Sequence, residues 1–511
     1  MKLKRLATFA VVMFAAMAVT AGYASAATAK IRQVAGLGMG LNNPGQSATV
    51  GPLLSSGTAA SESSWTRKAK SEGVQTVRVS VGWADIAPTK PSDPTDPASA
   101  AYNWAALDPT VIALHSEGFA VELVVSEAPS WAEGSGKPSY AAAGTWKPNA
   151  TDLGQFAQAL ATRYDGKYAN PADPGTVLPK VSSYEPWNEP NLSSNLAPQW
   201  SNATGSNCTA KFKGKTLESA ALYRGMQNAF YAGVKKAAAS DTVAMAGLAP
   251  YADPQCSLNV GLKTYRSSPV PFLRALFCLN SSDKHQSGCN TATHLDALNI
   301  HPYPPPDSHV GVTWTDAPAG DTPIADVHEL STVLNAAKKV HMVTTSKKTP
   351  IGFWATEVAW DTNAPDKGGV SDATAANWMN QGFYLLWNQG VRTIDWYRLA
   401  DISKFSGEDW PGGSGLFTAA GKAKTMATAF RFLFVTHRTG KNTVVAWGRT
   451  PVSGTLKVER KSGKRWITVA SGHAGSHEVF EATIKSSGST TYRAQVGSQT
   501  SLNWSQTKGT W

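Results

Sequence analysis

The chain has 511 residues and a formal net charge of +11, from 47 Lys and Arg residues against 36 Asp and Glu residues. This length is sufficient for one large domain and one small one. A basic charge can indicate a nucleic-acid partner, but the Lys and Arg residues are scattered and never form a run of five. We therefore expect no nucleic-acid partner, and expect adhesion to an anionic cell-surface polymer instead.

Residues 1–26 have the pattern of a secretory signal peptide. Three basic residues precede an apolar segment from residue 6 to about residue 21, and the small residues 24–26 form a cleavage site. The apolar segment is too short and too rich in alanine for a membrane anchor, and no second one follows. We predict a secreted protein that starts near Ala27, has no membrane span and keeps a net charge of about +8.

Four cysteines follow, namely Cys208, Cys256, Cys278 and Cys289. An even number of cysteines in an exported chain favours two disulfide bonds. Three pairings can be drawn, and we expect the local pair Cys278–Cys289, which leaves Cys208 to pair with Cys256. No C-x-x-C or histidine spacing accompanies the cysteines, so they do not indicate a metal site.

After the signal peptide, strand-like and helix-like segments alternate. The strand-like segments are apolar and rich in β-branched residues, and they predict strands at 34–41, 74–81, 119–126, 180–187, 242–250, 295–303, 350–360 and 391–399. The helix-like segments predict helices at 61–73, 104–117, 152–164, 219–239, 271–278, 326–339, 372–389 and 422–433. Ser371 and Gly390 are suitable caps for one of these helices.

Eight strands, each followed by a helix, predict an α/β fold with a parallel sheet closed into a (β/α)₈ TIM barrel. From about residue 437 no helix pattern appears, and short alternating runs are separated by Gly and Ser, which predicts a small C-terminal β-sandwich. We expect a barrel over 27–436 and an accessory β-sandwich over 437–511. The sandwich is either a structural module or a polysaccharide-binding one.

Side chains at the carboxyl ends of barrel strands face the site. The candidate residues at these ends are Arg78, Asn188, Glu189, His301, Tyr303, Glu357, Trp360 and Trp396. Glu189 and Glu357 end the fourth and seventh strands, which lie nearly opposite each other around the ring. Neither an Asp/His ligand set nor a nucleophilic serine motif accompanies them. We therefore expect no metal and no cofactor.

Two facing carboxylates suit the hydrolysis of a glycosidic bond. One carboxylic acid protonates the departing oxygen, while the other carboxylate attacks the anomeric carbon or activates water. A separation of about 5–5.5 Å between the carboxyl groups gives retention of configuration, and about 6.5–9.5 Å gives inversion. Long loops rich in Trp favour an oligo- or polysaccharide as the substrate.

The segment YEPWNEPNL (184–192) resembles the acid/base signature of the clan A glycoside hydrolases, which are (β/α)₈ barrels and retaining enzymes. ATEVAW (355–360) resembles the nucleophile segment of their seventh strand. VRVSVGWADIAP, IHPY and DWY fall in the expected order and strands, so the resemblance covers the whole barrel. It is greatest to family 39, because Asn191 and Leu192 follow the proline, and family 5 is the nearest competitor.

The resemblance implies a secreted retaining glycosidase in which Glu189 is the general acid/base and Glu357 the nucleophile of a double displacement. Arg78 and Tyr303 would hold the carboxylate of the nucleophile. Glu185, deeper in the same strand as Glu189, is expected to orient a neighbour. A non-catalytic glycan-binding barrel and a transglycosylase with the same residues are the alternatives, and the sugar and its linkage stay open.

The resemblance also implies substrate contacts around these residues. Asn188 would bind the sugar 2-hydroxyl, His301 would line the acid/base side, and Trp396 would be the platform under the sugar, with Trp360 close by. Some members of the clan carry a histidine at the end of the third strand, where this chain has Ser126-Glu127. This departure puts the neighbouring part of the sugar site in doubt. We expect the chain to act as a monomer.

Overall fold

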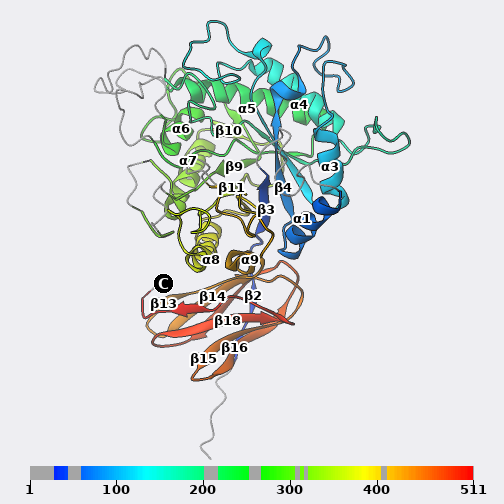
Figure 1. Cartoon of the computed structure of the whole chain (residues 1–511). Helices are drawn as coiled ribbons and strands as arrows, with labels where there is room; N and C mark the ends of the chain where they lie inside the picture. Colours follow the sequence, from blue (N-terminus) through cyan, green and yellow to red (C-terminus); the bar gives the residue numbers. More distant parts are fainter. Residues whose placement is uncertain are drawn as a thin grey trace, which may run out of the picture.

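The structure is a computed structural model that describes residues 28–43, 59–200, 217–252, 266–304, 311–315, 320–403 and 411–509. Figure 1 shows a barrel ringed by helices, with a β-sandwich packed at one end of it. The predicted signal peptide, Cys208 and Cys256 lie outside the described residues.

The predicted parallel barrel is confirmed. Its strands are β3 (Gly38–Asn43), β4 (Thr76–Gly82), β5 (Ala120–Ser126), β6 (Ser183–Pro186), β7 (Thr242–Val243), β9 (Ala297–Ile300), β11 (Gly352–Val358) and β12 (Thr393–Trp396). They pair in the order β7-β6-β5-β4-β3-β12-β11-β9. Parallel bridges from Ala244 to Ala297 and from Leu248 to Ile300 join the two ends of this sheet, so the barrel is closed.

Helices cover the outside of the barrel. They are α1 (Ala59–Ser71), the short α2 (Trp83–Ile86), α3 (Leu107–Ser116), α4 (Ala150–Arg163), α5 (Glu218–Ala237), α6 (Pro269–Leu276), α7 (His328–Lys339), α8 (Asp372–Asn388) and α9 (Thr425–Arg431). Ser371 caps α8 by accepting from the Thr374 N–H, as its position predicted. Helix α4 begins earlier than its pattern indicated, because the Asn149 side chain accepts from the Asp152 N–H.

The β-sandwich consists of two antiparallel sheets that take strands from both ends of the described chain. One sheet contains β13 (Leu433–Gly440), β14 (Thr443–Arg449), β17 (Val479–Lys485) and β2 (Arg32–Gln33). The other contains β16 (Arg465–Ala474), β15 (Gly454–Ser462), β18 (Thr490–Val496), β19 (Gln499–Thr500), β20 (Trp504–Gln506) and, paired in parallel with β16, β1 (Ala29–Lys30). From the sequence we expected the barrel to include residues 27–436. Within that range, strands β1 and β2 (residues 29–30 and 32–33) instead pair with strands of the sandwich.

The sandwich packs against the amino-terminal ends of the barrel strands. Arg449 on β14 is fully buried, and its Nε donates to the Leu37 carbonyl at 3.1 Å while Nη2 donates to Gln75 Oε1 at 2.8 Å. Leu37 and Gln75 lie just before β3 and β4. Since the sandwich occupies this end, the opposite, carboxyl-terminal end of the barrel is left open.

A disulfide joins Cys278 to Cys289, which confirms the predicted local pair. It ties the end of α6 to the loop that leads into the short strand β8 (Thr293–His294), which pairs with β10 (Val343–Thr344) outside the barrel. Within the described part of the chain, every helix is too short or too polar to cross a bilayer.

Candidate active site

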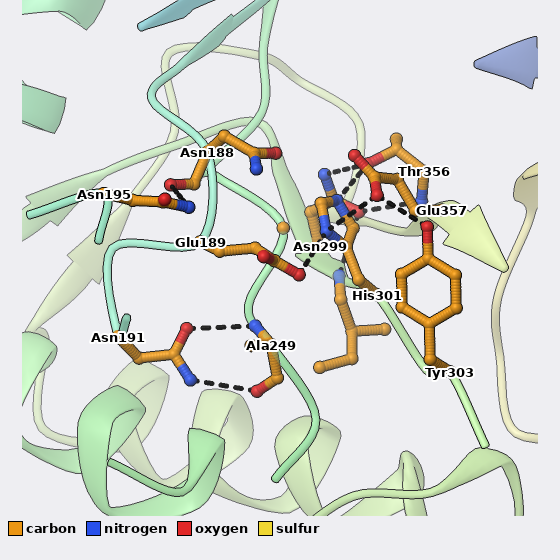
Figure 2. A network of polar contacts seen from close by, with 12 residues as sticks. Asn188, Glu189, Asn191, Asn195, Ala249, Asn299, His301, Tyr303, Thr356 and Glu357 are labelled. Carbon is orange, nitrogen blue, oxygen red and sulfur yellow. Dashed lines mark hydrogen bonds and ion pairs between the residues drawn. The ribbon is translucent and has the colours of Figure 1, made fainter. Parts of the chain in front are cut away.

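The carboxyl ends of the barrel strands surround a cleft of about 510 Å³. Five of the predicted residues line it, namely Arg78, Asn188, Glu189, Tyr303 and Glu357. His301 is fully buried and contacts Glu189 from behind this lining. Figure 2 shows Glu189 approaching from one side and Glu357 with Tyr303 from the other, with His301 between them. The strands therefore bring together the groups that sequence reasoning selected.

Glu357 is held by a donor at each carboxylate oxygen. Arg78 Nη1 donates to Oε1 at 2.8 Å, and the Tyr303 hydroxyl donates to Oε2 at 2.7 Å. Burial raises the pKa of Glu357, but the charges of His301 and Arg78 and the two hydrogen bonds outweigh it and leave the pKa below its usual value. These neighbours thus favour the ionised form of Glu357, although its side chain is largely buried in the wall of the cleft.

Glu189 is presented to the cleft by an unusual backbone. Trp187 and Glu189 have φ angles of 75° and 40°, in the left-handed region that non-glycine residues rarely adopt. Hydrogen bonds hold this turn, since the Trp187 indole donates to the Asn195 carbonyl at 2.8 Å and the Glu189 N–H to the Gly247 carbonyl at 3.1 Å. Backbone strain of this kind is common where a side chain is aimed at a functional site.

His301 links the two glutamates. Its Nδ1 lies 3.0 Å from Glu189 Oε1 and 3.7 Å from Glu357 Oε2. Burial lowers the pKa of His301, but the nearby charge of Glu357 and the hydrogen bond to Glu189 outweigh it and raise the pKa above its usual value. Gly247 makes room for the ring, because a Cβ at that position would lie 2.0 Å from His301 Nε2.

The two carboxylates are close together. One ligand atom from each of Glu189, His301 and Glu357 lies within 4.8 Å of the others. This spacing would also suit a metal ion. However, Oε1 and Oε2 of Glu357 already accept hydrogen bonds from Arg78 and Tyr303, so the groups present fit a pair of reacting carboxyls better than a metal site.

Arg78 is shared between the site and a carboxylate below it. Nε and Nη2 donate to Glu185 at 3.0 and 3.1 Å, and Nη2 also donates to Asn188 Oδ1 at 3.0 Å. The Gly247 N–H donates to Glu185 Oε1 at 2.8 Å. Glu185 therefore orients Arg78, and through it Glu357 and Asn188, as its deeper position in the strand suggested.

Two further buried carboxyls lie beside this group and were missed from sequence. Burial raises the pKa of Glu122 on β5 well above its usual value, and burial raises the pKa of Asp395 on β12 to about 8. Four carboxyl groups thus interact with one guanidinium, and burial favours the protonated form of two of them, Glu122 and Asp395. An acidic residue inside an apolar strand, as in AVELVVS and TIDW, is the signal that would have found them.

Trp396 and Trp360 do not line the cleft. Both side chains are fully buried and stack on each other with ring centroids 5.5 Å apart, and the Trp396 indole donates to the Ser414 carbonyl at 2.8 Å. The next residue, Tyr397, lines the cleft instead and contacts Tyr303 edge to face. The predicted Trp platform is therefore a packing layer, and the aromatic surface beside the nucleophile comes from two tyrosines.

Sequence reasoning also missed residues that brace or line the site. Thr356 Oγ1 lies 3.1 Å from His301 Nε2 and accepts from Asn299 Nδ2 at 2.7 Å. Tyr251 and Arg266 line the cleft beyond strand β7. Thr356 stands next to Glu357 in the ATEVAW motif but was not singled out, and Asn299, Tyr251 and Arg266 lie outside the motifs that pointed to the site.

The departure at Ser126-Glu127 has a structural counterpart. Both residues line a second hollow of about 260 Å³, which shares Ser126, Asn188, Ser194 and Asn195 with the cleft. A small hydroxyl at residue 126 leaves this side of the cleft open, whereas a histidine ring would occupy part of it.

Two glycosidases of known structure are similar to this chain in fold. A family 39 glycoside hydrolase from the gut symbiont Bacteroides cellulosilyticus superimposes with a TM-score of 0.50 at 16% identity, over 88% of this chain and 81% of its own. A glucosidase from Croceicoccus marinus superimposes with a TM-score of 0.50 at 13% identity, over 90% and 99%.

The chain shares its fold with clan A glycoside hydrolases. A GH5_18 protein from Bifidobacterium longum subsp. infantis is also similar, with a TM-score of 0.43 at 14% identity over 78% of both chains. No protein-family model and no curated protein matches the sequence. At these identities the likeness concerns the fold, and the chemistry has to be argued from the site itself.

Proposed function

We propose that this chain is a secreted glycosidase that hydrolyses an oligo- or polysaccharide with retention of configuration, with Glu357 as nucleophile and Glu189 as general acid/base. The observation that carries the proposal is the pair of glutamates in the cleft, whose ligand atoms lie within 4.8 Å of each other and of His301. Such a short spacing favours direct attack by one carboxylate over the activation of an intervening water.

In the first step, ionised Glu357 attacks the anomeric carbon while protonated Glu189 gives its proton to the departing oxygen. The Glu357 charge is available because Arg78 and Tyr303 stabilise it without solvent. The hydrogen bond between His301 Nδ1 and Glu189 Oε1 leaves Glu189 Oε2 to carry the transferred proton. The product is a glycosyl ester on Glu357 and a free leaving group.

In the second step, Glu189 acts as base and removes a proton from water, which attacks the anomeric carbon and releases Glu357. Asn188 assists in both steps as a donor. Because its Oδ1 accepts from Arg78, its Nδ2 group is the one that faces a substrate hydroxyl. Two inversions at the anomeric carbon leave its configuration unchanged.

The test uses two glutamate variants and an activated aryl glycoside chosen by screening a panel of sugars. Glu357→Ala should lose activity by a factor of about 10⁴ or more, and azide should restore turnover to a glycosyl azide of inverted configuration. Glu189→Ala should still form the ester with a good leaving group, and azide should give a glycosyl azide of retained configuration. A Glu357→Ala protein with near wild-type turnover would contradict the proposal.

A further inference from the structure

The positive charge of the chain is concentrated in one of its two domains. Residues 437–511 contain eleven Lys and Arg residues against three Glu, a net charge of +8 in 75 residues. Residues 27–436 contain 33 Lys and Arg residues and 33 Asp and Glu residues, so the barrel is neutral. The Lys and Arg residues are scattered along the sequence, but their excess over Asp and Glu in residues 27–511 comes from the sandwich, and the barrel is neutral.

Half of that excess lies in one hairpin. The segment RKSGKR (460–465) joins β15 to β16 and places Arg460, Lys461, Lys464 and Arg465 around a turn at Gly463, which has a φ angle of 55°. Arg460 is partly exposed and the other three are exposed. Within residues 411–509, all of which the structure describes, none of these four side chains pairs with a carboxylate, so their charges face solvent together.

The surroundings of the hairpin favour a polar, anionic ligand. Trp466 follows the four cations, but the guanidinium of Arg493 stacks over its ring at 4.2 Å, and Arg493 is itself paired with Glu459 at 2.7 Å. The guanidinium covers one face of the partly buried indole, so Trp466 offers a bilayer less apolar surface than a membrane anchor would. Ile467, 45% exposed, is the single large apolar side chain on the described part of this hairpin that is open to solvent.

The position of the hairpin leaves the cleft free. Arg449 joins the β13–β14–β17 sheet to the amino-terminal ends of the barrel strands, and β15 and β16 belong to the other sheet, farther from the barrel. Figure 1 shows the β15–β16 hairpin at the end of the molecule remote from the barrel. A polymer held there would not cover the carboxyl ends of the strands.

We propose that the β15–β16 hairpin binds an acidic polysaccharide and holds the enzyme on it while the cleft stays open. Four cations on one turn match a polymer with a repeating negative charge, and such binding weakens as salt screens it. The glycosidase proposal is not needed for this inference, because binding is measured separately from turnover.

The experiment measures binding of the mature full-length chain to polygalacturonate by affinity electrophoresis, with uncharged dextran for comparison. The hairpin variant replaces all four cations with glutamine (Arg460→Gln, Lys461→Gln, Lys464→Gln and Arg465→Gln). The matched control removes the same charge from exposed lysines of the barrel (Lys236→Gln, Lys338→Gln, Lys339→Gln and Lys348→Gln). Gly463 is kept in both, and equal melting temperatures show that both are folded.

We expect the wild-type chain to bind polygalacturonate but not dextran, with affinity falling as NaCl rises from 50 to 500 mM. The hairpin variant should bind about tenfold more weakly or worse, while the barrel control keeps wild-type affinity. Equal losses in both variants, or none in the hairpin variant, would overturn the proposal. Tighter binding to duplex DNA or to phosphatidylglycerol vesicles than to polygalacturonate would also overturn it.

Turnover of a small aryl glycoside should be equal in all three proteins, so a failure of binding leaves the glycosidase proposal standing.

Discussion

The charge of Glu357 is set by two neighbouring residues rather than by water. Only 9% of the residue is exposed, and each carboxylate oxygen accepts one strong hydrogen bond, from Arg78 or from Tyr303. Arg78 cannot lose its proton, whereas the tyrosine contributes through its hydroxyl alone. The two donors can therefore be separated by substitution, and the tyrosine can be changed without altering the net charge of the site.

Tyr303→Phe should move the acid limb of the pH profile of kcat/KM to higher pH. The lost hydrogen bond stabilises the ionised form of Glu357, so its removal raises the pKa of that carboxyl, and a larger share of the enzyme is inactive in mild acid. A hydrogen bond to a charged group is worth about 1.5–3 kcal/mol, so the limb should move by about one pH unit or more. The profile is measured on an aryl glycoside, with the limb at alkaline pH as internal control. An unmoved acid limb would contradict the assigned role of Tyr303.

At the scale of the element, the loop after β6 positions both Asn188 and Glu189. Asn191 is fully buried and fastens this loop with three hydrogen bonds, donating to the Ala249 and Ser267 carbonyls and accepting from the Ala249 N–H, each at 2.9 Å. Figure 2 shows the paired bonds to Ala249. The loop is thus tied to the segment after β7, which also supplies Gly247 beneath His301.

Asn191→Ala should destabilise the fold and misplace the acid/base. It leaves three buried backbone groups without a partner, each at a cost of about 1–3 kcal/mol before relaxation. We expect a loss of about 2 kcal/mol or more in the free energy of unfolding and a fall in kcat/KM of about tenfold or more. Asn335→Ala, on an exposed position of α7, is the control and should change neither. Wild-type stability and kinetics in Asn191→Ala would show that the loop is held in another way.

The alternation of strands and helices predicted the barrel, because each element carries a periodic pattern of its own. The two glutamates were found because each follows a strand in a distinctive motif. Trp396 was placed under the sugar by resemblance alone, and a resemblance in sequence does not say whether a side chain at the last residue of a strand points into the cleft or into the packing around it. Strands β1 and β2 have two residues each, which is too short for any pattern, and only their pairing with β16 and β17 reveals them. The long-range neighbours of Arg78, such as Asp395, also arise only when the ring closes.

At the scale of the whole molecule, the sandwich lies at the end of the barrel opposite the cleft, and it carries the net positive charge while the barrel is neutral. The sandwich covers the amino-terminal ends of the barrel strands, while the cleft lies at their carboxyl ends. Arg449 is one of the buried connections between the two domains, and burial lowers its pKa to about 10. A buried guanidinium costs free energy unless its donors are used, and here Nε and Nη2 donate to Leu37 and Gln75.

Arg449→Met should weaken the joint between the domains. The substitution keeps most of the apolar volume but removes the Arg449 donor from the Leu37 carbonyl and one of two donors from Gln75 Oε1, which still accepts from the Met39 N–H. We expect the melting temperature to fall by about 5 °C or more, measured by calorimetry. Arg465→Met, at an exposed position of the same sandwich, is the matched control and should melt as the wild type does. Equal melting of both variants would mean that Arg449 does not join the domains.

The central claim is that Glu357 becomes covalently bonded to the sugar. The most direct measurement is mass spectrometry of the wild-type chain after incubation with a cyclophellitol-type or 2-deoxy-2-fluoroglycosyl probe of the sugar selected by screening. We predict the addition of one probe per chain, located by peptide mapping on Glu357, and no label in Glu357→Ala. A label on another carboxylate, or a fully active chain that is never labelled while it inverts its substrate, would contradict the account.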